Sequence, residues 1–411
     1  MSNLNNHDQD YAESAVPAFD RRSNLTMFMI MLGFTFFSAS MWAGQTLAQG
    51  LDWAGFWTAL LLGGAILGTY TGALGYIGAK TGLSMDLLAR KAFGEKGSFV
   101  PSAMIAFTQI GWFGVGVAMF AIPVAKVMSG GDKMVEWALV IIGGFLMTVT
   151  AYYGIKSLTA ISYVAVPAVG VLGMVATYMA VSQGDASLVD QFAKSSGNLT
   201  VISGAGIVIG SFVSGGTTTP NFTRFAKNGP VGAVATVVAF LLGNSLMFFF
   251  GGVASAYAGG NDIFEVMIKL GLFSMAFIVL GLNIWTTNDN ALYSGGLGLA
   301  NITGFSKKAM VLISGAVGTV GAVWLYNNFC GWLSMLNATL PPVGIILILS
   351  YMCNSQSYEN NRITTEVNWF AVAGVIIGAV AANYITWGIS AINGMVVAAV
   401  CYLAGQMIGI R

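Results

Sequence analysis

Two short runs of the sequence decide the expected fold: GFTFFSAS, residues 33–40, and GSFVSGGTTTP, residues 210–220. Each lies inside a long apolar stretch and mixes glycine with hydroxyl and phenylalanine side chains. Such residues can release backbone groups from a helix, and unwound backbone at membrane depth must line a cavity. Paired interruptions in two halves of a chain are typical of transporters. The plainer alternative is that either run is a face packed against neighbouring helices.

The composition around these runs is that of an integral membrane protein. Of 411 residues, 56% are hydrophobic and 8% are charged, whereas a soluble domain has about 25% charged residues. A net charge of +1 provides no basic surface for nucleic acid, so we expect no such partner. Three scattered cysteines predict neither a disulfide framework nor a metal cluster. His7 is the only histidine, which excludes a buried histidine relay.

Twelve apolar stretches are long enough to cross a bilayer, which takes about 20 residues. They lie at 25–49, 54–79, 98–128, 134–154, 157–182, 199–219, 229–258, 264–298, 307–326, 328–353, 366–386 and 388–409. Because the first stretch has full membrane length, residues 1–24 are interpreted as a retained tail rather than a signal peptide.

The basic residues predict how the spans are oriented. With the N-terminus inside, 13 lysines and arginines fall in the inner segments and four in the outer ones. The positive-inside rule then places both termini in the cytoplasm. An even number of helices agrees with this, so residues 1–24 are expected to be a cytoplasmic tail.

A constant spacing relates the two interrupted helices. Phe36 and Phe212 are 176 residues apart, and the same offset relates an amide–indole pair on the third helix of each half. This offset predicts two five-helix repeats, 25–182 and 199–353, followed by two additional helices at 366–409. Because five is odd, the second repeat has the opposite orientation, which is the inverted-repeat plan of many transporters. The similarity is low letter by letter, so coincidence is the alternative.

An amide and an indole share one face of the third helix, because Gln109 and Trp112 are three residues apart. A mid-membrane amide is costly without a partner, and a helix–helix hydrogen bond is its simplest use. Further aromatic, hydroxyl and amide groups come from the second interruption and the eighth helix. These are Ser211, Phe212, Ser214 and Asn288. An aromatic pocket with a neutral polar edge suits a nucleobase, and the lack of nearby Arg or Lys argues against carboxylate or phosphate substrates.

The run NIWTTNDN in the eighth helix is the most polar cluster in any predicted span. Asn283, Thr286 and Thr287 share one helix face. Carbonyl oxygens freed at Gly33 and Phe36 would end a half-helix, where transporters of this plan hold Na⁺. Neutral oxygens suit that cation, and we expect no cofactor beyond Na⁺ as the coupling ion. The alternative is that the threonine hydroxyls only bond to carbonyls of their own helix.

Asp289 is the only mid-membrane carboxylate, away from the ends of the predicted spans, and it leaves other functions open. An intramembrane acid is a functional candidate by default, although a structural or gating role is the interpretation we favour. One alternative is a proton-coupled permease for a purine or related heterocycle. Another is a LeuT-type amino-acid transporter, which needs partners for charged amino and carboxyl groups. A membrane hydrolase needs catalytic groups that the sequence scarcely offers, so we expect no enzyme.

Several strings resemble one known family. LGFTFFSASMW, GYIGAKTGL, QIGWFGVGVAMFAIP, GNSLMF, LGLNIWTTNDNALY and LYNNFCGWL are similar to the first nucleobase–cation symporter family, over about residues 25–345. The resemblance implies the LeuT-type fold and sodium-driven import of a nucleobase, cytosine first, by alternating access. It also implies a bacterial inner membrane, and we expect a monomer.

The resemblance further implies roles for the candidate site residues. A base would stack between Trp112 and Phe212. Gln109, Ser211, Ser214 and Asn288 would bond its edge, and Na⁺ would lie near Gly33, Phe36, Asn283, Thr286 and Thr287. Other branches have tryptophan in place of Phe212, so larger substrates such as hydantoins do not carry over. The amides of Gln109 and Asn288 can turn to match cytosine or uracil, and the residues alone leave that choice open.

Overall fold

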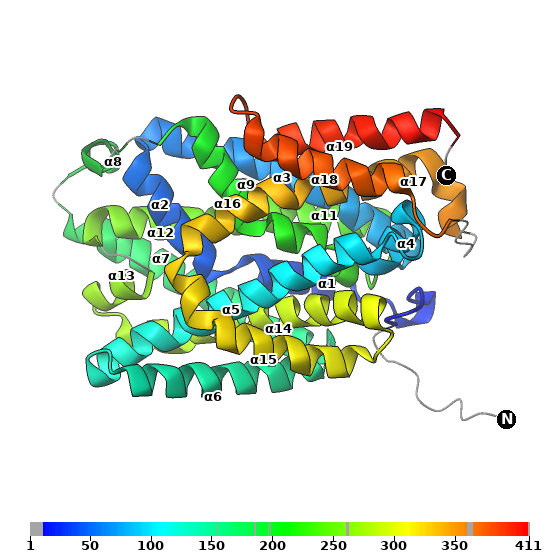
Figure 1. Cartoon of the computed structure of the whole chain (residues 1–411). Coiled ribbons are helices and arrows are strands. Elements are labelled where there is room, and N and C mark those ends of the chain that lie inside the picture. The colour runs from blue at the N-terminus through cyan, green and yellow to red at the C-terminus, as the bar shows by residue number, and fades with distance from the viewer. Residues whose placement is uncertain are drawn as a thin grey trace.

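The computed structural model describes residues 11–409, except 154, 185, 196, 198, 260–262 and 360–364. Residues 1–10 of the predicted tail, including His7, therefore lie outside the described part. Within that part every regular element is a helix and none is a strand, as Figure 1 shows. The prediction of an all-α fold is confirmed.

Each predicted span corresponds to one helix or to one interrupted helix. The first five are α1 (Asn24–Thr35) with α2 (Ser38–Gly50), α3 (Trp53–Thr81), α5 (Phe99–Ser129), α6 (Lys133–Tyr152) and α7 (Ile155–Gln183). The next five are α9 (Val201–Thr217) with α10 (Pro220–Thr223), α11 (Gly229–Val237) with η2 (Val238–Gly243) and α12 (Asn244–Ala258), α14 (Phe273–Thr303), α15 (Lys307–Asn327), and α16 (Phe329–Thr339) with α17 (Pro341–Glu359). The last two are α18 (Trp369–Tyr384) and α19 (Ser390–Met407).

Two short helices that the sequence did not predict as spans mark the two ends of the molecule (Figure 1). Helix α4 (Met85–Phe93) lies at the end that also holds residues 11–23, which we call the α4 end. Helix α8 (Leu188–Ser195) lies at the opposite end, the α8 end, as does α13 (Ile263–Lys269). The predicted span 264–298 is therefore divided, because Gly271 has a positive φ of 75° and ends α13 before α14 begins.

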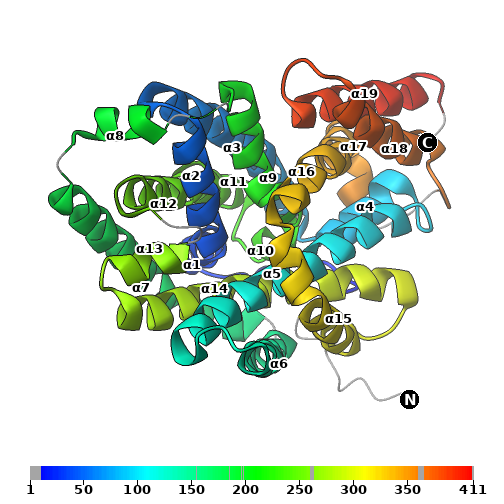
Figure 2. The ribbon, with the colours of Figure 1, turned by 60° about the vertical axis from the view of Figure 1, so that its left-hand side comes forward.

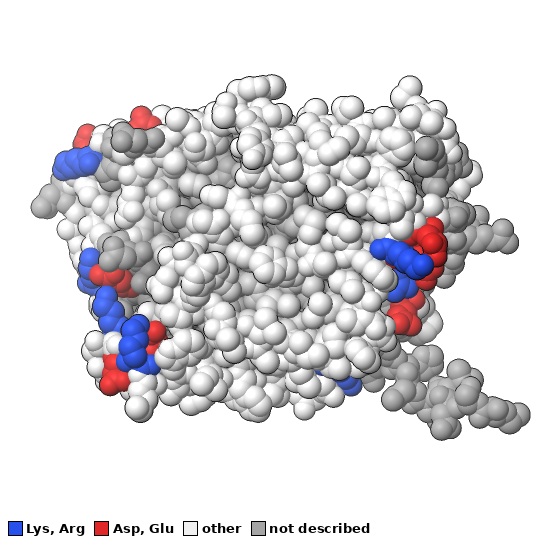
Figure 3. Space-filling view, viewed as in Figure 1, with Lys and Arg blue, Asp and Glu red and all other residues white. Residues whose placement is uncertain are grey.

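The surface between these ends is apolar. Figure 3 shows charged side chains gathered at the two ends and a broad, almost uncharged band between them. Ile142 and Phe145 on α6, Val320 on α15 and Val400 on α19 are each more than half exposed. Among the described residues, eight helices are long and apolar enough to span a membrane, and the bent pair α1–α2 makes nine. The chain is a multi-pass membrane protein.

The two predicted interruptions differ in extent. Helix α1 ends where expected, and the axis bends by 51° between α1 and α2. In the second run the helix continues through Thr217 and is broken only at Thr218 and Thr219, so the interruption is narrower than predicted. The glycines serve close packing instead, because a Cβ at Gly215 would meet Phe34 and one at Gly216 would meet Thr71.

Helix packing repeats between the two halves with the partners exchanged. Helix α1 packs on α7 as α9 packs on α16, and α2 packs on α12 as α9 packs on α3. Helices α5 and α14 pack on one another between the halves. This exchange is what two inverted repeats produce. Helices α18 and α19 lie at one edge of the molecule, next to α17 (Figure 2).

Helices α2 and α12 approach so closely that side chains are excluded at two points. A Cβ at Gly44 would come within 2.1 Å of the Phe248 carbonyl oxygen, and one at Gly251 within 2.0 Å of the Met41 carbonyl oxygen. Glycine is the residue that permits this approach between membrane helices. The second half of the interrupted helix is therefore held firmly against its neighbour.

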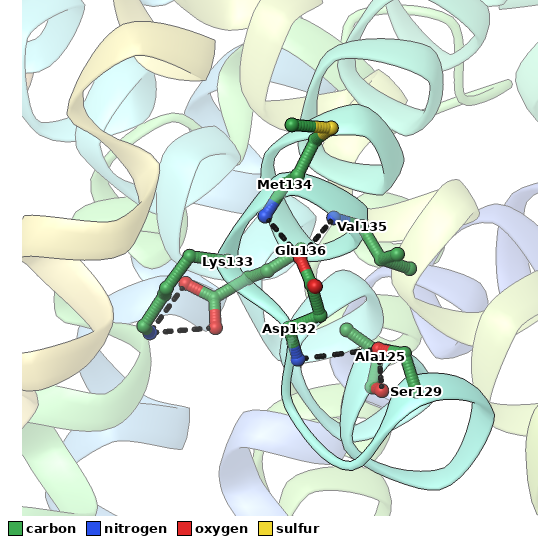
Figure 4. A network of polar contacts seen from close by, with 7 residues as sticks. All are labelled: Ala125, Ser129, Asp132, Lys133, Met134, Val135 and Glu136. Carbon is green, nitrogen blue, oxygen red and sulfur yellow. Dashed lines mark hydrogen bonds and ion pairs between the residues drawn. The ribbon is translucent and has the colours of Figure 1, made fainter.

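The turn between α5 and α6 shows how local sequence sets a helix boundary (Figure 4). Helix α5 ends at Gly130, which adopts the left-handed conformation with φ of 68°. The Asp132 carboxylate then accepts hydrogen bonds from the backbone N–H groups of Met134 and Val135 and caps α6. Lys133 pairs with Glu136 at 2.8 Å in the first turn. These charges lie at the α8 end, outside the apolar band.

Candidate functional site

A small central cavity brings most of the predicted substrate residues together. It is lined by Phe34, Phe37, Gln109, Trp112, Ser211, Phe212, Gly215, Thr287 and Ala291. These residues come from α1, the start of α2, α5, α9 and α14. None of them is charged. The cavity measures about 10 Å³ for the centre of a water-sized sphere, which is about the space of one water molecule. A larger molecule therefore enters only when side chains move.

Phe37 lies between the two rings that were expected to hold a base. Its ring is edge-on to Trp112, with 5.8 Å between centroids, and edge-on to Phe212 at 6.2 Å. Phe34 and Phe240 also pack edge-on against Phe212, at 5.3 and 5.5 Å. Trp112 and Phe212 thus face the same space, and a flat ring that replaced Phe37 there would contact both.

Hydroxyl and amide groups form the polar side of the cavity. Gln109 Nε2 donates to Ser214 Oγ at 2.7 Å, and the Ser214 hydroxyl donates to Thr108 Oγ1 at 2.9 Å. The Ser211 hydroxyl donates to the Val208 carbonyl oxygen at 2.8 Å. The structure therefore brings Gln109, Ser211 and Ser214 to one side of the cavity. Ser214 reaches the cavity only through Gln109, because it is fully buried behind it.

Asn288 does not line the cavity. Its Nδ2 donates to the Phe113 carbonyl oxygen at 3.2 Å and lies 3.1 Å from Met147 Sδ. The amide fills the space beside Gly116, where a Cβ would come within 2.2 Å of its Oδ1. Asn288 thus joins α14 to α5 and α6. Thr287, which was expected at the cation site, lines the cavity although Asn288 does not.

The break between α1 and α2 contacts α14 on both of its sides. The Asn283 side chain accepts a hydrogen bond from the backbone N–H of Ser38 at 2.8 Å, at the start of α2. The Thr286 hydroxyl lies 3.3 Å from the Gly33 carbonyl oxygen, in the last turn of α1. Between them Phe36 ends α1 with non-helical dihedrals, φ −74° and ψ 78°. Four of the five predicted cation ligands therefore lie at this break, and the hydroxyl of the fifth, Thr287, bonds to the Asn283 carbonyl oxygen beside them.

The hydrogen bonds in this region also fit the alternative interpretation, in which the threonine hydroxyls bond to carbonyl groups of their own helix. The hydroxyls of Thr286 and Thr287 donate to the Asn283 carbonyl oxygen at 2.8 and 3.3 Å, which is the bond to their own helix that needs no cation. Each hydroxyl oxygen keeps lone pairs for a further partner. Among the described residues, His, Cys, Asp and Glu form no cluster of three that could hold a metal, so a cation here would rest on neutral oxygens.

Asp289 faces away from the cavity. The Thr150 hydroxyl at the end of α6 donates to Asp289 Oδ1 at 2.6 Å, and Trp285 Nε1 donates to Thr150 Oγ1 at 2.7 Å. Trp285 and Asp289 thus tie α14 to α6. Trp285 lies 176 residues after Gln109 and is the indole of the pair in the second half, but it belongs to this helix contact and not to the site.

An aromatic layer closes the cavity toward the α8 end. Phe329 of α16 stacks on Trp42 with 4.2 Å between centroids and meets Trp112 edge-on at 6.1 Å. Beyond α16 lies a vestibule of about 880 Å³, whose walls include Thr46 and Asn337. Movement of α16 would therefore open the cavity toward this vestibule.

A buried arginine closes the cavity toward the α4 end. Arg224, which is 0% exposed, donates to the Tyr11 carbonyl oxygen at 2.7 Å and to the Tyr293 hydroxyl at 2.8 Å. The N-terminal segment continues across this end, where the backbone N–H of Arg22 donates to the Phe225 carbonyl oxygen at 2.7 Å. A second vestibule of about 710 Å³ lies beyond, with Asp86 in its wall. The central cavity is thus covered on both sides.

Asp86 of α4 predicts a pH dependence of stability. Burial raises its pKa to about 6, although the Ser102 hydroxyl and the charges of Arg224 and Arg90 act in the opposite direction. An acid whose pKa is higher in the folded state binds its proton more tightly there. Stability therefore falls as the pH rises from about 4 to about 6 and is constant above that. Asp86→Asn should remove up to about 3 kcal/mol of this dependence.

Thermal unfolding in detergent between pH 4 and pH 7 measures this effect. Glu95→Gln, which changes an exposed acid at the same end, is the matched control and should keep the wild-type profile. An Asp86→Asn profile that followed the wild type across this range would show that Asp86 is charged throughout.

Several residues at the cavity were not identified from the sequence. Phe34 and Phe37 lie in the first interrupted run, which indicated the break but not the direction of the rings. Thr108 precedes Gln109, and Asn244, whose Nδ2 lies 3.4 Å from Ser211 Oγ, belongs to the GNSLMF string. Asn244 follows the π-helix η2, a rare element that often marks functional sites but has no sequence signature.

Comparisons with known proteins agree with this arrangement. Residues 15–407 match a family model described as permease for cytosine/purines, uracil, thiamine, allantoin. The chain is 48% identical to the cytosine permease of Escherichia coli over 398 residues, which cover 96% of this chain and 94% of that protein. It is 24% identical to the hydantoin permease of Microbacterium maritypicum over 363 residues, 78% of this chain and 73% of that protein.

Solved structures with the same fold include two symporters. A nucleobase-cation-symport-1 family transporter, in a closed conformation with bromovinylhydantoin bound, matches with a TM-score of 0.82 at 18% identity, covering 97% of this chain and 95% of the other. A Na⁺-coupled sialic acid symporter matches with a TM-score of 0.72 at 12% identity, covering 98% and 93%. At these identities the likeness shows the fold, and the predicted LeuT-type fold is confirmed.

Proposed function

The chain belongs to the family of permeases for cytosine/purines, uracil, thiamine and allantoin, and on that premise we propose that it imports cytosine by sodium symport. It is a transporter and not an enzyme. The observation that carries the proposal is the uncharged aromatic cavity in contact with the break between α1 and α2. A flat neutral heterocycle suits such a cavity, because stacking and neutral hydrogen bonds satisfy its surface.

The base takes the place of the Phe37 ring in this proposal. Phe37 is the residue that precedes α2, so a small rotation of α2 or of the side chain removes the ring from between Trp112 and Phe212. The base then stacks on both rings, and Gln109 and Ser211 bond to its edge. The 48% identity to a cytosine permease supports cytosine as the substrate.

Adjacent residues supply a route for coupling between ion and base. Phe36, a proposed cation ligand, is followed by Phe37 in the cavity. On α14 the proposed ligand Thr286 is followed by Thr287, which also lines the cavity. Na⁺ bound between α1 and α14 would therefore fix both cavity residues. Each ligand then raises the affinity for the other by the same factor.

Two alternatives have weaker support. Proton coupling through Asp289 has to act at a distance, because that carboxylate bonds to Thr150 on α6 and does not line the cavity. An amino-acid substrate needs exposed backbone or charge for its carboxylate, but α9 is helical through Ser211 and Ser214 and the cavity wall is neutral. A substrate as large as a hydantoin derivative fits the cavity beside Phe212 less well than a pyrimidine does.

In this proposal the protein lies in a bacterial inner membrane with the α4 end in the cytoplasm. The α4 end carries most of the basic residues, among them Arg21, Arg90 and Lys307, whereas Lys126 and Lys269 belong to the α8 end. The positive-inside rule favours this orientation. Both termini then lie inside, and a reporter that is active only in the cytoplasm, fused to the C-terminus, tests the assignment.

Uptake by proteoliposomes tests the proposed function. We expect radiolabelled cytosine to accumulate under an inward Na⁺ gradient, and to accumulate at least about tenfold less when K⁺ replaces Na⁺. A pH gradient in sodium-free buffer is the control for proton coupling, and Asp289→Asn should retain sodium-driven uptake. If uptake proceeded without Na⁺ and was abolished in Asp289→Asn, the coupling ion would be a proton and not Na⁺. A panel of bases and amino acids as competitors identifies the substrate class.

A further inference from the structure

A chain of hydrogen bonds behind the cavity ends on a backbone carbonyl. The Thr108 hydroxyl donates to the Ile105 carbonyl oxygen at 2.9 Å. The Ser214 hydroxyl donates to Thr108 Oγ1 at 2.9 Å, and Gln109 Nε2 donates to Ser214 Oγ at 2.7 Å. All three side chains are at most 2% exposed. Solvent therefore does not compete for these bonds, and we call this chain the Thr108 relay.

The direction of the Thr108 relay cannot be reversed. A carbonyl oxygen only accepts, and a hydroxyl has a single hydrogen, so Thr108 spends its hydrogen on Ile105. Ser214 then spends its own hydrogen on Thr108 and has only lone pairs for Gln109. Turning the Gln109 amide would place its oxygen against the lone pairs of Ser214, and an unpaired buried acceptor is costly. Gln109 is thus held with its nitrogen toward Ser214 and its oxygen free.

Ser211 has the same fixed polarity on the cavity wall. Its hydrogen is used on the Val208 carbonyl oxygen at 2.8 Å, and Asn244 Nδ2 lies 3.4 Å from its oxygen on the other side. Thr287 likewise spends its hydrogen on the Asn283 carbonyl oxygen. The hydroxyls that line the cavity therefore offer acceptor oxygens to a ligand. They favour a ligand edge that carries N–H groups.

We propose that the Thr108 relay selects amino-substituted over oxo-substituted pyrimidines, with Thr108 as a positioning residue that does not touch the substrate. This inference rests on the proposed function and names its substrate more narrowly. Cytosine offers a donor, the 4-amino group, followed by an acceptor, N3. Uracil offers an acceptor, the 4-oxo group, followed by the N3–H donor. In a pose that the acceptor oxygens of Ser211 and Thr287 also fix, an amide held in one orientation matches one order only. The relay therefore favours cytosine over uracil, which would have to shift or turn over to use its N3–H and 2-oxo groups.

Competition between cytosine and uracil measures this selection in the full-length protein in proteoliposomes. Wild type should need at least about tenfold more uracil than unlabelled cytosine to halve the uptake of labelled cytosine. Thr108→Val removes the hydroxyl with little change in volume, and frees the Ser214 hydrogen for a turned amide. The uracil-to-cytosine ratio should then fall by about tenfold. Thr108→Ser restores the hydroxyl and should restore the wild-type ratio.

The ratio separates a specific role from general damage, because a loosened fold weakens both bases alike. Thr236→Val is the matched control, since Thr236 is a fully buried threonine that bonds to the Gly232 carbonyl oxygen and does not line the cavity. If Thr108→Val does not fold, Ser214→Ala tests the same step, because it also frees the Gln109 amide.

The outcomes distinguish the inference from the function on which it rests. Loss of discrimination in Thr108→Val together with its return in Thr108→Ser supports the relay. Undiminished discrimination in a transporting Thr108→Val overturns it, and so does a wild type that accepts uracil and cytosine equally. Neither of those results affects base transport itself. A wild type that transports no base overturns the proposed function.

Discussion

Replacing Trp112 by alanine should abolish measurable cytosine uptake while the protein remains folded in the membrane. Trp112 is 6% exposed and forms one wall of the cavity. Stacking of a base on an aromatic ring contributes roughly 1–3 kcal/mol, which corresponds to about a tenfold to a hundredfold loss of affinity. The gap beside Phe37 and Phe329 should also let these rings collapse into the site. Uptake of labelled cytosine and direct binding by calorimetry measure the loss.

Two further variants separate stacking from folding. Removing a buried tryptophan costs about 3–5 kcal/mol of stability, so the melting temperature of each variant is measured beside its uptake. Trp112→Phe keeps an aromatic face and should retain a reduced but measurable uptake. Trp324→Ala removes a tryptophan that is 67% exposed on α15 and should transport normally. Wild-type uptake by Trp112→Ala would remove the stacking site from the proposal.

Most of the fold could be predicted because it depends on the lipid bilayer that surrounds the protein. A bilayer requires about 20 apolar residues for each span, and the sequence shows where these stretches begin and end. The details of the fold that were predicted wrongly depend on close packing between helices. Gly215 and Gly216 favour unwinding in isolation, but in the structure they let α9 approach Phe34 and Thr71, and the helix continues. Gly271 divided a predicted span by a positive φ, which the surrounding hydropathy did not indicate.

The sequence predicted which types of residue form the candidate site, but not the direction in which each side chain points. Gln109, Trp112, Ser211 and Phe212 all line the cavity, as the pairing of amide and aromatic groups suggested. Asn288 follows Thr287, which lines the cavity from α14, but its own side chain points to α5, because adjacent positions on a helix face different neighbours. The sequence carries no signal for that difference of about a quarter turn.

The polarity of Gln109 shows what the structure adds. From the sequence its amide could turn to match either cytosine or uracil, since oxygen and nitrogen occupy equivalent positions. The bond from Thr108 to the Ile105 carbonyl oxygen removes that freedom, although it lies two hydrogen bonds away from the amide. Such a constraint depends on which helix faces which, and spacing along one helix does not contain it.

Asn283→Ala should shift the sodium dependence of uptake to higher Na⁺ concentrations. The Asn283 side chain accepts from the backbone N–H of Ser38 at 2.8 Å, and its loss leaves that buried donor unpaired at a cost of about 1–3 kcal/mol. Helix α2 then loses its tie to α14 at the break, while the Asn283 backbone carbonyl still accepts from Thr286. The apparent affinity for Na⁺ should fall by at least about tenfold, and the affinity for cytosine at a fixed Na⁺ concentration should fall with it, because the coupling is reciprocal.

Uptake measured against Na⁺ concentration, with cytosine below saturation, tests this expectation. Thr303→Val is the control on the same helix, because its hydroxyl bonds to the Leu299 carbonyl, the Met310 sulfur and the backbone N–H of Phe305, far from the break. Asn283→Asp keeps the acceptor and adds a negative charge, so it should bind Na⁺ at least as tightly as wild type. If the sodium dependence of Asn283→Ala were unchanged, the cation site would have to lie elsewhere than at the break between α1 and α2. Both Phe37 and Thr287 would then lose their proposed link to the ion, and the coupling would have to reach the cavity through other residues.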